Sequence, residues 1–281
     1  MSIVLVAGAT GYLGKFVVKE FKKNGYWVRA LGRNFEKLDK ISNHIDDKFI
    51  AEVTNKNMLK GICNNIDIVF SSIGITKQKD GLTYMDIDYR ANKNLLDEAV
   101  KSGVKKFIYI SVFGIERMKN LKAIQAKLKF ENALKDSGLD YSIIYPNGFF
   151  SDMMEYLQMA KQGKGMVIGT GDNKINPIHG ADLAEICVSA VNSKESKIEA
   201  GGPEVFTHNE IFKIAFGLYN TKPKTSHFPI WMKNLSLVIL RIFTSVKVYG
   251  PIEFFMTVLS TDMVAPKYGA RKLKEFFKQN L

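Results

Sequence analysis

Three glycines near the amino end of the chain have a spacing that indicates a chemical role. Gly8, Gly11 and Gly14 stand three residues apart in the sequence G-A-T-G-Y-L-G. Glycine lets a chain turn sharply, lets backbone N–H groups approach a ligand and lets a helix pack tightly on a strand. Unpaired N–H groups at the start of a helix attract phosphates. The spacing predicts a site for the diphosphate of a dinucleotide; the alternative is a glycine-rich turn without a ligand.

The segments on either side of these glycines support this interpretation. Residues 3–7 read I-V-L-V-A, a run typical of a strand buried on both faces. A helical pattern follows over residues 11–24 and ends at Asn24-Gly25. Strand, glycine turn and helix in this order open a dinucleotide-binding unit. In this turn we expect cofactor contacts from Gly8, Thr10, Gly11, Tyr12, Leu13 and Gly14.

Two arginines in and after the second predicted strand bear on which dinucleotide binds. Proteins that bind NAD commonly place an Asp or Glu near this strand end to hold the ribose hydroxyls, whereas an arginine suits the 2′-phosphate of NADP. Arg29 and Arg33 occur here, and no acid occupies the strand end, so we expect NADP in preference to NAD. Arg33 lies past the strand end and is the stronger candidate. The alternative is that both arginines are simply solvated.

Further cofactor contacts are expected in the turns after the third, fourth and sixth predicted strands, because ligands bind at the carboxyl ends of such strands. The first turn would meet the adenine, the second would pass close to the ribose, and the third would lie beside the nicotinamide. In this order, the residues are Glu52 and Val53, then Ser72 and Gly74, then Pro146, Asn147 and Gly148.

The first half of the chain alternates between strand-like and helix-like segments, and several predicted helices end in Asn-Gly or Ser-Gly. This rhythm is typical of right-handed βαβ units and predicts an α/β fold, a doubly wound parallel sheet of the Rossmann type with helices on both faces. The strands are expected at residues 3–7, 26–31, 48–53, 67–71, 106–111 and 141–145, and the helices at 11–24, 58–64, 86–102 and 121–137.

The rhythm breaks after Phe150. We predict a nucleotide-binding domain over residues 1–146, to which 177–200 return, and a smaller, C-terminal substrate region from 147–176 and 201–281. Within this region, Thr207 to Glu210 reads T-x-x-E, a capping box that opens a helix.

The segment from Trp231 to Val264 is the most apolar part of the chain, interrupted by a few charged residues. It predicts an amphipathic pair of helices with a wide apolar face. This face could cover the substrate pocket or form an interface between subunits. Alternatively, residues 230–264 could make peripheral contact with a membrane or line a groove for a long apolar substrate.

Composition narrows the class of protein. The chain has 281 residues, 46% hydrophobic and 24% charged, which indicates a globular protein with a sizeable core. Its two cysteines, Cys63 and Cys187, form no C-x-x-C pattern, which argues against a disulfide framework and a zinc site and suits the reducing cytoplasm. We expect no metal. The amino end enters the first strand without room for a signal peptide, and no uncharged apolar run has the length of a membrane span.

The net charge of +12 admits two interpretations. Lysines are spread through the whole chain, so a general compositional bias explains it. Alternatively, the charge attracts anions, such as a phosphorylated cofactor, an acidic membrane surface or nucleic acid. No helix-turn-helix or zinc-finger spacing supports nucleic acid, and we expect none as a partner.

These motifs together resemble the atypical and extended short-chain dehydrogenase/reductases. Their relatives include the NmrA-like NAD(P)-binding proteins, the divinyl-chlorophyllide reductase type and the Rossmann accessory subunit of respiratory complex I. The resemblance extends over nearly the whole chain. Its motifs are G-A-T-G-Y-L-G at 8–14, R-A-L-G-R at 29–33, D-Y-R-A-N-K-N-L-L at 88–96, G-V-K-K-F-I-Y-I-S at 103–111, A-K-L-K-F-E at 126–131, S-G-L-D-Y-S-I-I-Y-P at 137–146 and P-I-H-G-A-D-L-A at 177–184.

The resemblance implies a catalytic set in which one member is missing. Ordinary members use a Ser that orients a carbonyl, a Tyr that protonates it and a Lys four residues later that holds the nicotinamide ribose. Ser111 and Lys127 match the Ser and the Lys, but the tyrosine position falls on Ala123. A positioned general acid typically contributes about 10²–10⁴-fold to a rate. The candidate replacements are Tyr84, Tyr89, His179 and, as the preferred one, Tyr145 beside the nicotinamide turn.

The leading functional hypothesis is an NADP(H)-dependent oxidoreductase that acts on an apolar or conjugated small molecule. Without a tyrosine at position 123, a conjugated C=C bond or a quinone is easier to accommodate than a plain ketone. One alternative is a redox sensor or assembly factor that binds NAD(P)H without turnover. Another is an epimerase or dehydratase, because the superfamily includes these activities as well.

Overall fold

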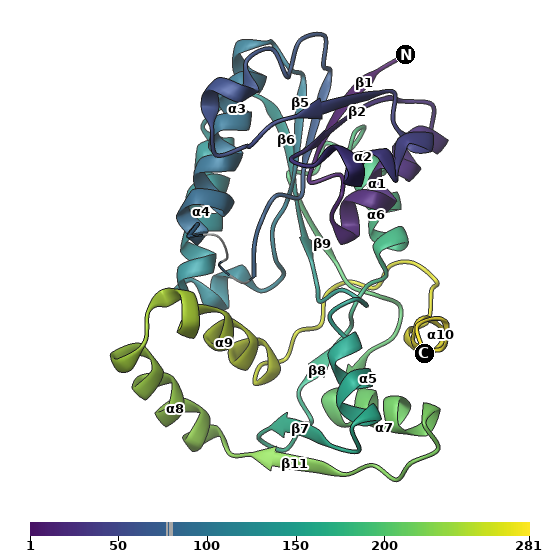
Figure 1. Ribbon diagram of the computed structural model, residues 1–281, viewed down its shortest axis with the longest axis vertical. Helices are drawn as coiled ribbons and strands as arrows, with labels where there is room; N and C mark the ends of the chain where they lie inside the picture. The colour runs from purple at the N-terminus through teal and green to yellow at the C-terminus, as the bar shows by residue number, and fades with distance from the viewer. Residues whose placement is uncertain (77, 79–80) are drawn as a thin grey trace.

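The computed structural model describes residues 1–76, 78 and 81–281. Seven parallel strands form one sheet in the order β3-β2-β1-β4-β5-β6-β9 (upper part of Figure 1). The strand order reverses between β1 and β4, and doubly wound sheets bind their ligands at such a point. The expected fold is therefore confirmed. The strands span Ile3–Ala7 (β1), Trp27–Gly32 (β2), Asp47–Ile50 (β3), Ile68–Ser71 (β4), Lys106–Ile110 (β5), Asp140–Pro146 (β6) and Lys197–Ala200 (β9).

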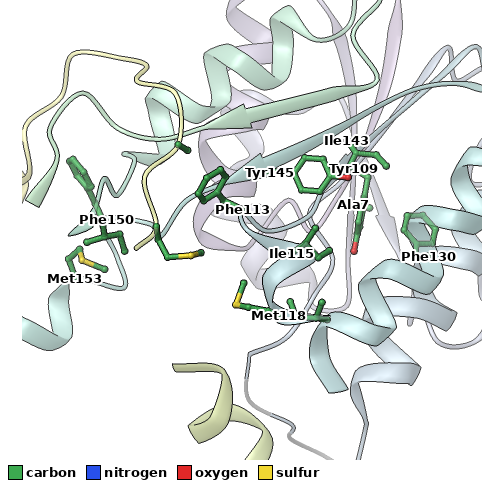
Figure 2. Close-up of a cluster of buried hydrophobic side chains, with 14 of the residues drawn as sticks. Ala7, Tyr109, Phe113, Ile115, Met118, Phe130, Ile143, Tyr145, Phe150 and Met153 are labelled. Atoms are coloured by element: carbon green, nitrogen blue, oxygen red, sulfur yellow. The ribbon is translucent and has the colours of Figure 1, made fainter. Parts of the chain in front are cut away.

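Helices cover both faces of this sheet because its strands are apolar on both sides. Val4 and Val6 of β1 belong to one buried cluster, and Leu5 and Ala7 belong to another, since successive strand residues point to opposite faces. Figure 2 shows part of the second cluster. The first face is covered by α1 (Tyr12–Lys23) and α6 (Gly180–Ser189), and the second by α3 (Asn92–Lys101) and α4 (Lys122–Lys135).

A smaller region faces the carboxyl ends of the strands (lower part of Figure 1). In it, β7 pairs with β11 and β8 with β10. The predicted helical pair is present as α8 and α9, and the predicted capping box opens α7. The elements of this region are α5 (Met154–Lys161), β7 (Gly165–Ile168), β8 (Lys174–Ile175), β10 (Phe206–Thr207), α7 (His208–Leu218), β11 (Thr225–Phe228), α8 (Ile230–Phe243), α9 (Val246–Leu259) and α10 (Leu273–Gln279).

Two elements between residues 177 and 200 contact the nucleotide-binding half of the chain. Helix α6 packs on α1, and β9 pairs with β6. The domain boundaries themselves stay a prediction.

The prediction of a helix over residues 58–64 is wrong. Lys56–Leu59 forms a short 3-10 helix, and turns continue beyond it. Gly61 and Asn65 have φ angles of 79° and 61°, in the left-handed region that a right-handed helix excludes. An apolar period was present in this segment, but backbone conformation overrides it.

Two other boundaries differ from the expected ones. Strand β3 ends at Ile50, so Glu52 and Val53 lie in the turn that follows it. The helix expected from residue 86 begins with a π-helical segment, Met85–Ala91, before α3. No helix among the described residues combines the length and the apolar composition needed to cross a bilayer.

Candidate cofactor and active site

The turn between β1 and α1 has no room for side chains at Gly8 and Gly14. Gly8 has a φ of +85°, and a Cβ there would lie 2.6 Å from Ser72 Oγ. A Cβ on Gly14 would lie 2.0 Å from the carbonyl oxygen of Gly8, so only glycine lets α1 begin this close to β1. The Gly11 N–H donates to the Gly8 carbonyl at 3.0 Å and closes the turn. Bare backbone therefore faces outward at the amino end of α1, as a diphosphate site requires.

A pocket of about 340 Å³ extends from this turn along the carboxyl ends of β2 and β4. Residues predicted from separate parts of the sequence line it together, namely Gly8, Thr10, Gly11, Arg33, Glu52, Val53, Ser72 and Gly74. Small residues and backbone form its phosphate end, and side chains after β2 and β3 form its far end. This arrangement suits the adenosine half of a dinucleotide.

The structure separates the two arginines that were considered for a 2′-phosphate. Arg29 Nε donates to Asp47 Oδ2 at 2.6 Å, and its Nη1 donates to the Ile62 carbonyl at 2.8 Å, so its fork is already occupied. The Arg33 side chain is 61% exposed and has only a long contact, 3.5 Å, to Glu52 Oε2. Because Arg33 also lines the pocket, it is the arginine with donors to offer a ligand.

A larger cavity of about 430 Å³ adjoins this pocket, and Gly11, Ser72, Gly74 and Ile75 line both. Seven other predicted residues lie on its wall: Tyr12, Leu13, Ser111, Lys127, Pro146, Asn147 and Gly148. Most of the remaining wall is apolar and comes mainly from α5, β7 and α9, through Met153, Tyr156, Met159, Met166, Phe254, Phe255, Val258 and Leu259. The smaller pocket, called the groove below, thus opens directly into the larger cavity, called the apolar chamber below.

Lys127 lies beside the turn after β4, which lines both cavities. Its Nζ is 2.9 Å from Asp88 Oδ1 and would be 3.0 Å from a Cβ on Gly74. The Asp88 side chain is fully buried. Burial alone lowers the pKa of Lys127, but the neighbouring Asp88 carboxylate outweighs burial and raises the Lys127 pKa above its ordinary value. The Lys127 ammonium group therefore lies in the apolar chamber, next to the point where the groove joins it.

Comparison with known proteins agrees with this geometry. A family model described as NAD(P)H-binding matches residues 8–194. The chain belongs to this NAD(P)H-binding family. The predicted resemblance to the atypical short-chain dehydrogenase/reductases is thereby confirmed, and so is the expectation of a nicotinamide dinucleotide.

Individual relatives of this NAD(P)H-binding protein match most of its length. The divinyl chlorophyllide a 8-vinyl-reductase of Arabidopsis thaliana is 30% identical, over 98% of this chain and 75% of that protein. The photosystem II assembly factor Ycf39 of Trieres chinensis is 22% identical, over 85% of this chain and 76% of that protein.

Solved structures share the fold. The NADPH-dependent quinone oxidoreductase of Escherichia coli, complexed with NADPH, has a TM-score of 0.72 at 16% identity, covering 99% of both chains. The triphenylmethane reductase of a Citrobacter species, complexed with NADP(H), has a TM-score of 0.75 at 17% identity, covering 100% of both chains.

The catalytic residues inferred from the resemblance have unexpected partners in this NAD(P)H-binding protein. Ser111 Oγ donates to Glu131 Oε1 at 2.5 Å, and the Tyr145 hydroxyl donates to Glu131 Oε2 at 2.8 Å. Glu131 is only 1% exposed. A serine hydroxyl has a single proton, so towards the cavity Ser111 offers an acceptor oxygen. This differs from the expected role, in which the hydroxyl donates to a carbonyl.

Tyr145, the preferred replacement for the missing tyrosine, is not on the wall of either cavity. Burial, followed by the charge of Glu131, raises its pKa. The structure therefore does not bring Tyr145 to either cavity. The sequence had a signal for Glu131, which lies four residues after Lys127 on the same helix and closes the motif A-K-L-K-F-E.

The other candidate acids also lie outside both cavities. The Tyr84 hydroxyl donates to the Thr76 carbonyl at 2.9 Å, and its ring packs near Ala123. The Lys129 ammonium lies over the Tyr89 ring, 4.5 Å from the centroid of that ring. His179 Nδ1 accepts from the N–H of Ala181 and caps α6. All three have structural contacts that account for them.

One tyrosine on the apolar wall was missed. Tyr156 lines the larger cavity, and its hydroxyl lies 2.7 Å from Nδ1 of the buried His208. Burial lowers the pKa of His208 to about 4, which keeps the imidazole neutral. Nothing in the local sequence pairs these two residues, which lie 52 positions apart.

Proposed function

We propose that the chain is an NADPH-dependent reductase of a flat, apolar, conjugated molecule, such as a quinone or an enone. One observation carries this proposal. The groove beside the glycine turn opens into the apolar chamber, and Lys127 lies beside a different turn, the one after β4, which lines both. Bound NADPH supplies a hydride from its nicotinamide ring. Arg33, with donors free for a 2′-phosphate, supports NADPH over NADH.

The polar groups of the chamber favour a conjugated acceptor over a plain ketone. Reduction of a ketone concentrates negative charge on one oxygen, which a general acid must protonate. Position 123 is an alanine, and the Ser111 proton is directed to Glu131. Hydride addition to a quinone or an enone spreads the charge over the conjugated system. The Lys127 ammonium then stabilises that charge electrostatically, and the proton can follow from water.

The names of the relatives support the same substrate class. They include a vinyl reductase of divinyl chlorophyllide, a quinone oxidoreductase and a triphenylmethane reductase. An epimerase or dehydratase receives less support, because the mostly apolar chamber wall offers few partners for sugar hydroxyls.

The experiment mixes the purified protein with NADPH and a panel of quinones, enones, aldehydes and simple ketones and follows nicotinamide absorbance. We expect oxidation with members of the first two classes, lost in Lys127→Ala and kept in Lys129→Ala, a lysine of the same helix outside both cavities. Steady NADPH oxidation with simple ketones that Lys127→Ala abolishes would contradict the proposal.

A second candidate is a protein that binds NAD(P)H as a sensor or assembly factor. The alanine at 123 and the Ser111–Glu131 hydrogen bond favour it, and one relative is named an assembly factor. Calorimetric binding of NADPH without oxidation by any member of the panel would support this candidate over the reductase.

A further inference from the structure

Helix α8 turns its apolar side chains to solvent. Trp231, Ile242 and Phe243 are 66%, 68% and 79% exposed. Leu235 and Val238, at 52% and 49%, continue the same surface between them. Only Leu237 of this 14-residue helix is buried. In Figure 1 the helix lies at the outer edge of the molecule, with α9 between it and the sheet.

The two basic side chains of α8 contact α9. Lys233 Nζ donates to Ser260 Oγ at 2.9 Å, at the end of α9. Arg241 pairs with the buried Glu253 of α9. A helix on the surface of a globular protein normally shows the opposite arrangement, with the apolar stripe inward and the charges outward. The contacts with α9 therefore hold the apolar face of α8 outward.

The sequence around α8 is free of acids. Between Glu210 and Glu253 it contains no Asp or Glu, and its basic residues are Lys213, Lys222, Lys224, Lys233, Arg241 and Lys247. Lys222 and Lys224 precede the helix and Lys247 follows it, and all three are exposed. Within the described part of the chain, none of these three lies within 4 Å of a carboxylate. The apolar face is thus flanked by unpaired positive charge.

We propose that α8 docks on the surface of an anionic lipid bilayer, with its axis in the plane of the membrane. A helix of 14 residues is about 21 Å long, and its apolar side chains would enter the boundary between headgroups and acyl chains. Lysines at both ends would meet anionic headgroups, each contributing attraction at the surface. A second copy of the chain is a poorer occupant, because both copies carry a charge of +12 and repel each other.

The position of α9 connects this surface with the chamber. Phe254, Phe255, Val258 and Leu259 of α9 line the larger cavity, while other contacts of α9 hold α8. A bilayer under α8 would therefore lie next to the chamber and could supply it with apolar molecules. This consequence rests on the proposed function, whereas the docking itself does not.

The first experiment is flotation of the full chain with vesicles of phosphatidylcholine alone and with equal parts of phosphatidylglycerol and phosphatidylcholine. We expect binding to the anionic vesicles, reduced at least about tenfold by Leu235→Asp/Ile242→Asp. The matched control Met58→Asp/Val100→Asp changes two apolar residues that are each 45% exposed elsewhere, and it should bind as the unchanged protein does. Equal binding to neutral vesicles, or an equal loss in the control, would overturn the proposal.

A second measurement does not depend on the charged variants folding. The chain has two tryptophans, so Trp27→Phe leaves Trp231 as the single reporter. Its emission should shift to the blue when anionic vesicles are added. An unchanged spectrum, or self-association through α8 without vesicle binding, would refute the docking. NADPH oxidation with the panel of quinones and enones, measured on the same samples without vesicles, tests the proposed function separately.

Discussion

Ser111 Oγ and Glu131 Oε1 lie 2.5 Å apart, and this contact joins the wall of the apolar chamber to a buried carboxylate. The same carboxylate accepts from Tyr145, so two buried hydroxyls depend on one side chain. A serine inferred to act on substrate and a tyrosine inferred to replace a missing acid therefore share a structural centre. Glu131 lies on α4 one turn after Lys127, so one helix carries both Lys127 and the partner of Ser111.

Removal of the Glu131 carboxylate should destabilise the fold. Glu131→Ala leaves the hydroxyls of Ser111 and Tyr145 without their acceptor, and each orphaned buried group costs about 1–3 kcal/mol. We expect the free energy of unfolding in urea to fall by about 2–6 kcal/mol. Glu131→Gln, which keeps an acceptor, should cost much less. A loss no larger than that of the exposed control Glu275→Ala would show that the carboxylate is not the centre of this network.

Variants of the Lys127–Asp88 pair should distinguish an effect on stability from an effect on activity. Lys127→Ala leaves the fully buried Asp88 carboxylate unpaired, which typically costs about 3–5 kcal/mol. The double variant Lys127→Ala/Asp88→Asn removes that charge, so it should recover most of the stability. It should not recover NADPH oxidation, because the ammonium group is still absent. Urea unfolding and turnover measured on both variants check this, and recovered turnover in the double variant would refute a direct role for Lys127.

Substitution of Gly11 should weaken cofactor binding without unfolding the protein. A Cβ at this position would lie 3.2 Å from the Gly8 carbonyl oxygen, and a larger side chain would project over the amino end of α1. We expect Gly11→Val to weaken NADPH binding by at least about tenfold, measured by calorimetry. Gly217→Ala is the matched control, because a Cβ there meets nothing within 4 Å. Unchanged affinity in Gly11→Val, with circular dichroism intact, would place the diphosphate elsewhere.

Arg33 should decide between the two coenzymes. A hydrogen bond to a charged group contributes about 1.5–3 kcal/mol, so Arg33→Ala should weaken NADPH binding by roughly 10- to 100-fold. NADH, which has no 2′-phosphate, should bind nearly as before. Arg90→Ala removes one positive charge from an exposed side chain outside both cavities and controls for net charge. Equal losses for NADPH and NADH would contradict a specific contact between Arg33 and the 2′-phosphate.

Acid should destabilise the protein through His208. Burial lowers its pKa to about 4 from an ordinary value of 6.5, so between these values the unfolded chain binds a proton that the folded chain does not. Stability is therefore lost as the pH falls from 6.5 towards 4. From pH 7 to pH 5, this group alone should reduce the free energy of unfolding by about 2 kcal/mol.

Urea unfolding of His208→Gln at both pH values isolates this contribution. The variant should lose less stability on acidification than the unchanged protein, while the exposed His227→Gln should behave like the unchanged protein. An identical pH dependence in all three proteins would show that His208 does not stay neutral in the folded state.

The fold and the glycine turn were predictable because their determinants are local. The strand of residues 3–7, the glycine spacing after it and the helix that follows are adjacent in the chain, and steric exclusion at Gly8 and Gly14 leaves few other conformations. The alternation of strands and helices then restricts the topology to a doubly wound sheet. The segment at 58–64 shows the limit of such predictions. Gly61 and, just after the segment, Asn65 have left-handed backbone conformations, which exclude the helix that the apolar period predicted.

The site was only partly predictable, because side-chain direction and partner are tertiary properties. Arg33 was preferred over Arg29 by its place past the strand end, but only the structure shows that Asp47 lies within reach of the Arg29 fork. Tyr145 precedes the expected nicotinamide turn, yet its hydroxyl faces Glu131. Tyr156 meets His208 across 52 positions, which no local pattern records.

By itself, the sequence determined a dinucleotide-binding α/β protein, because glycine sterics and apolar periodicity act over short distances along the chain. Only the tertiary structure decided which charged groups are free and which are paired. It joined the groove to an apolar chamber and turned the apolar face of α8 outward. These outcomes depend on contacts between segments far apart in the chain, and burial, pairing and exposure are defined by such contacts alone.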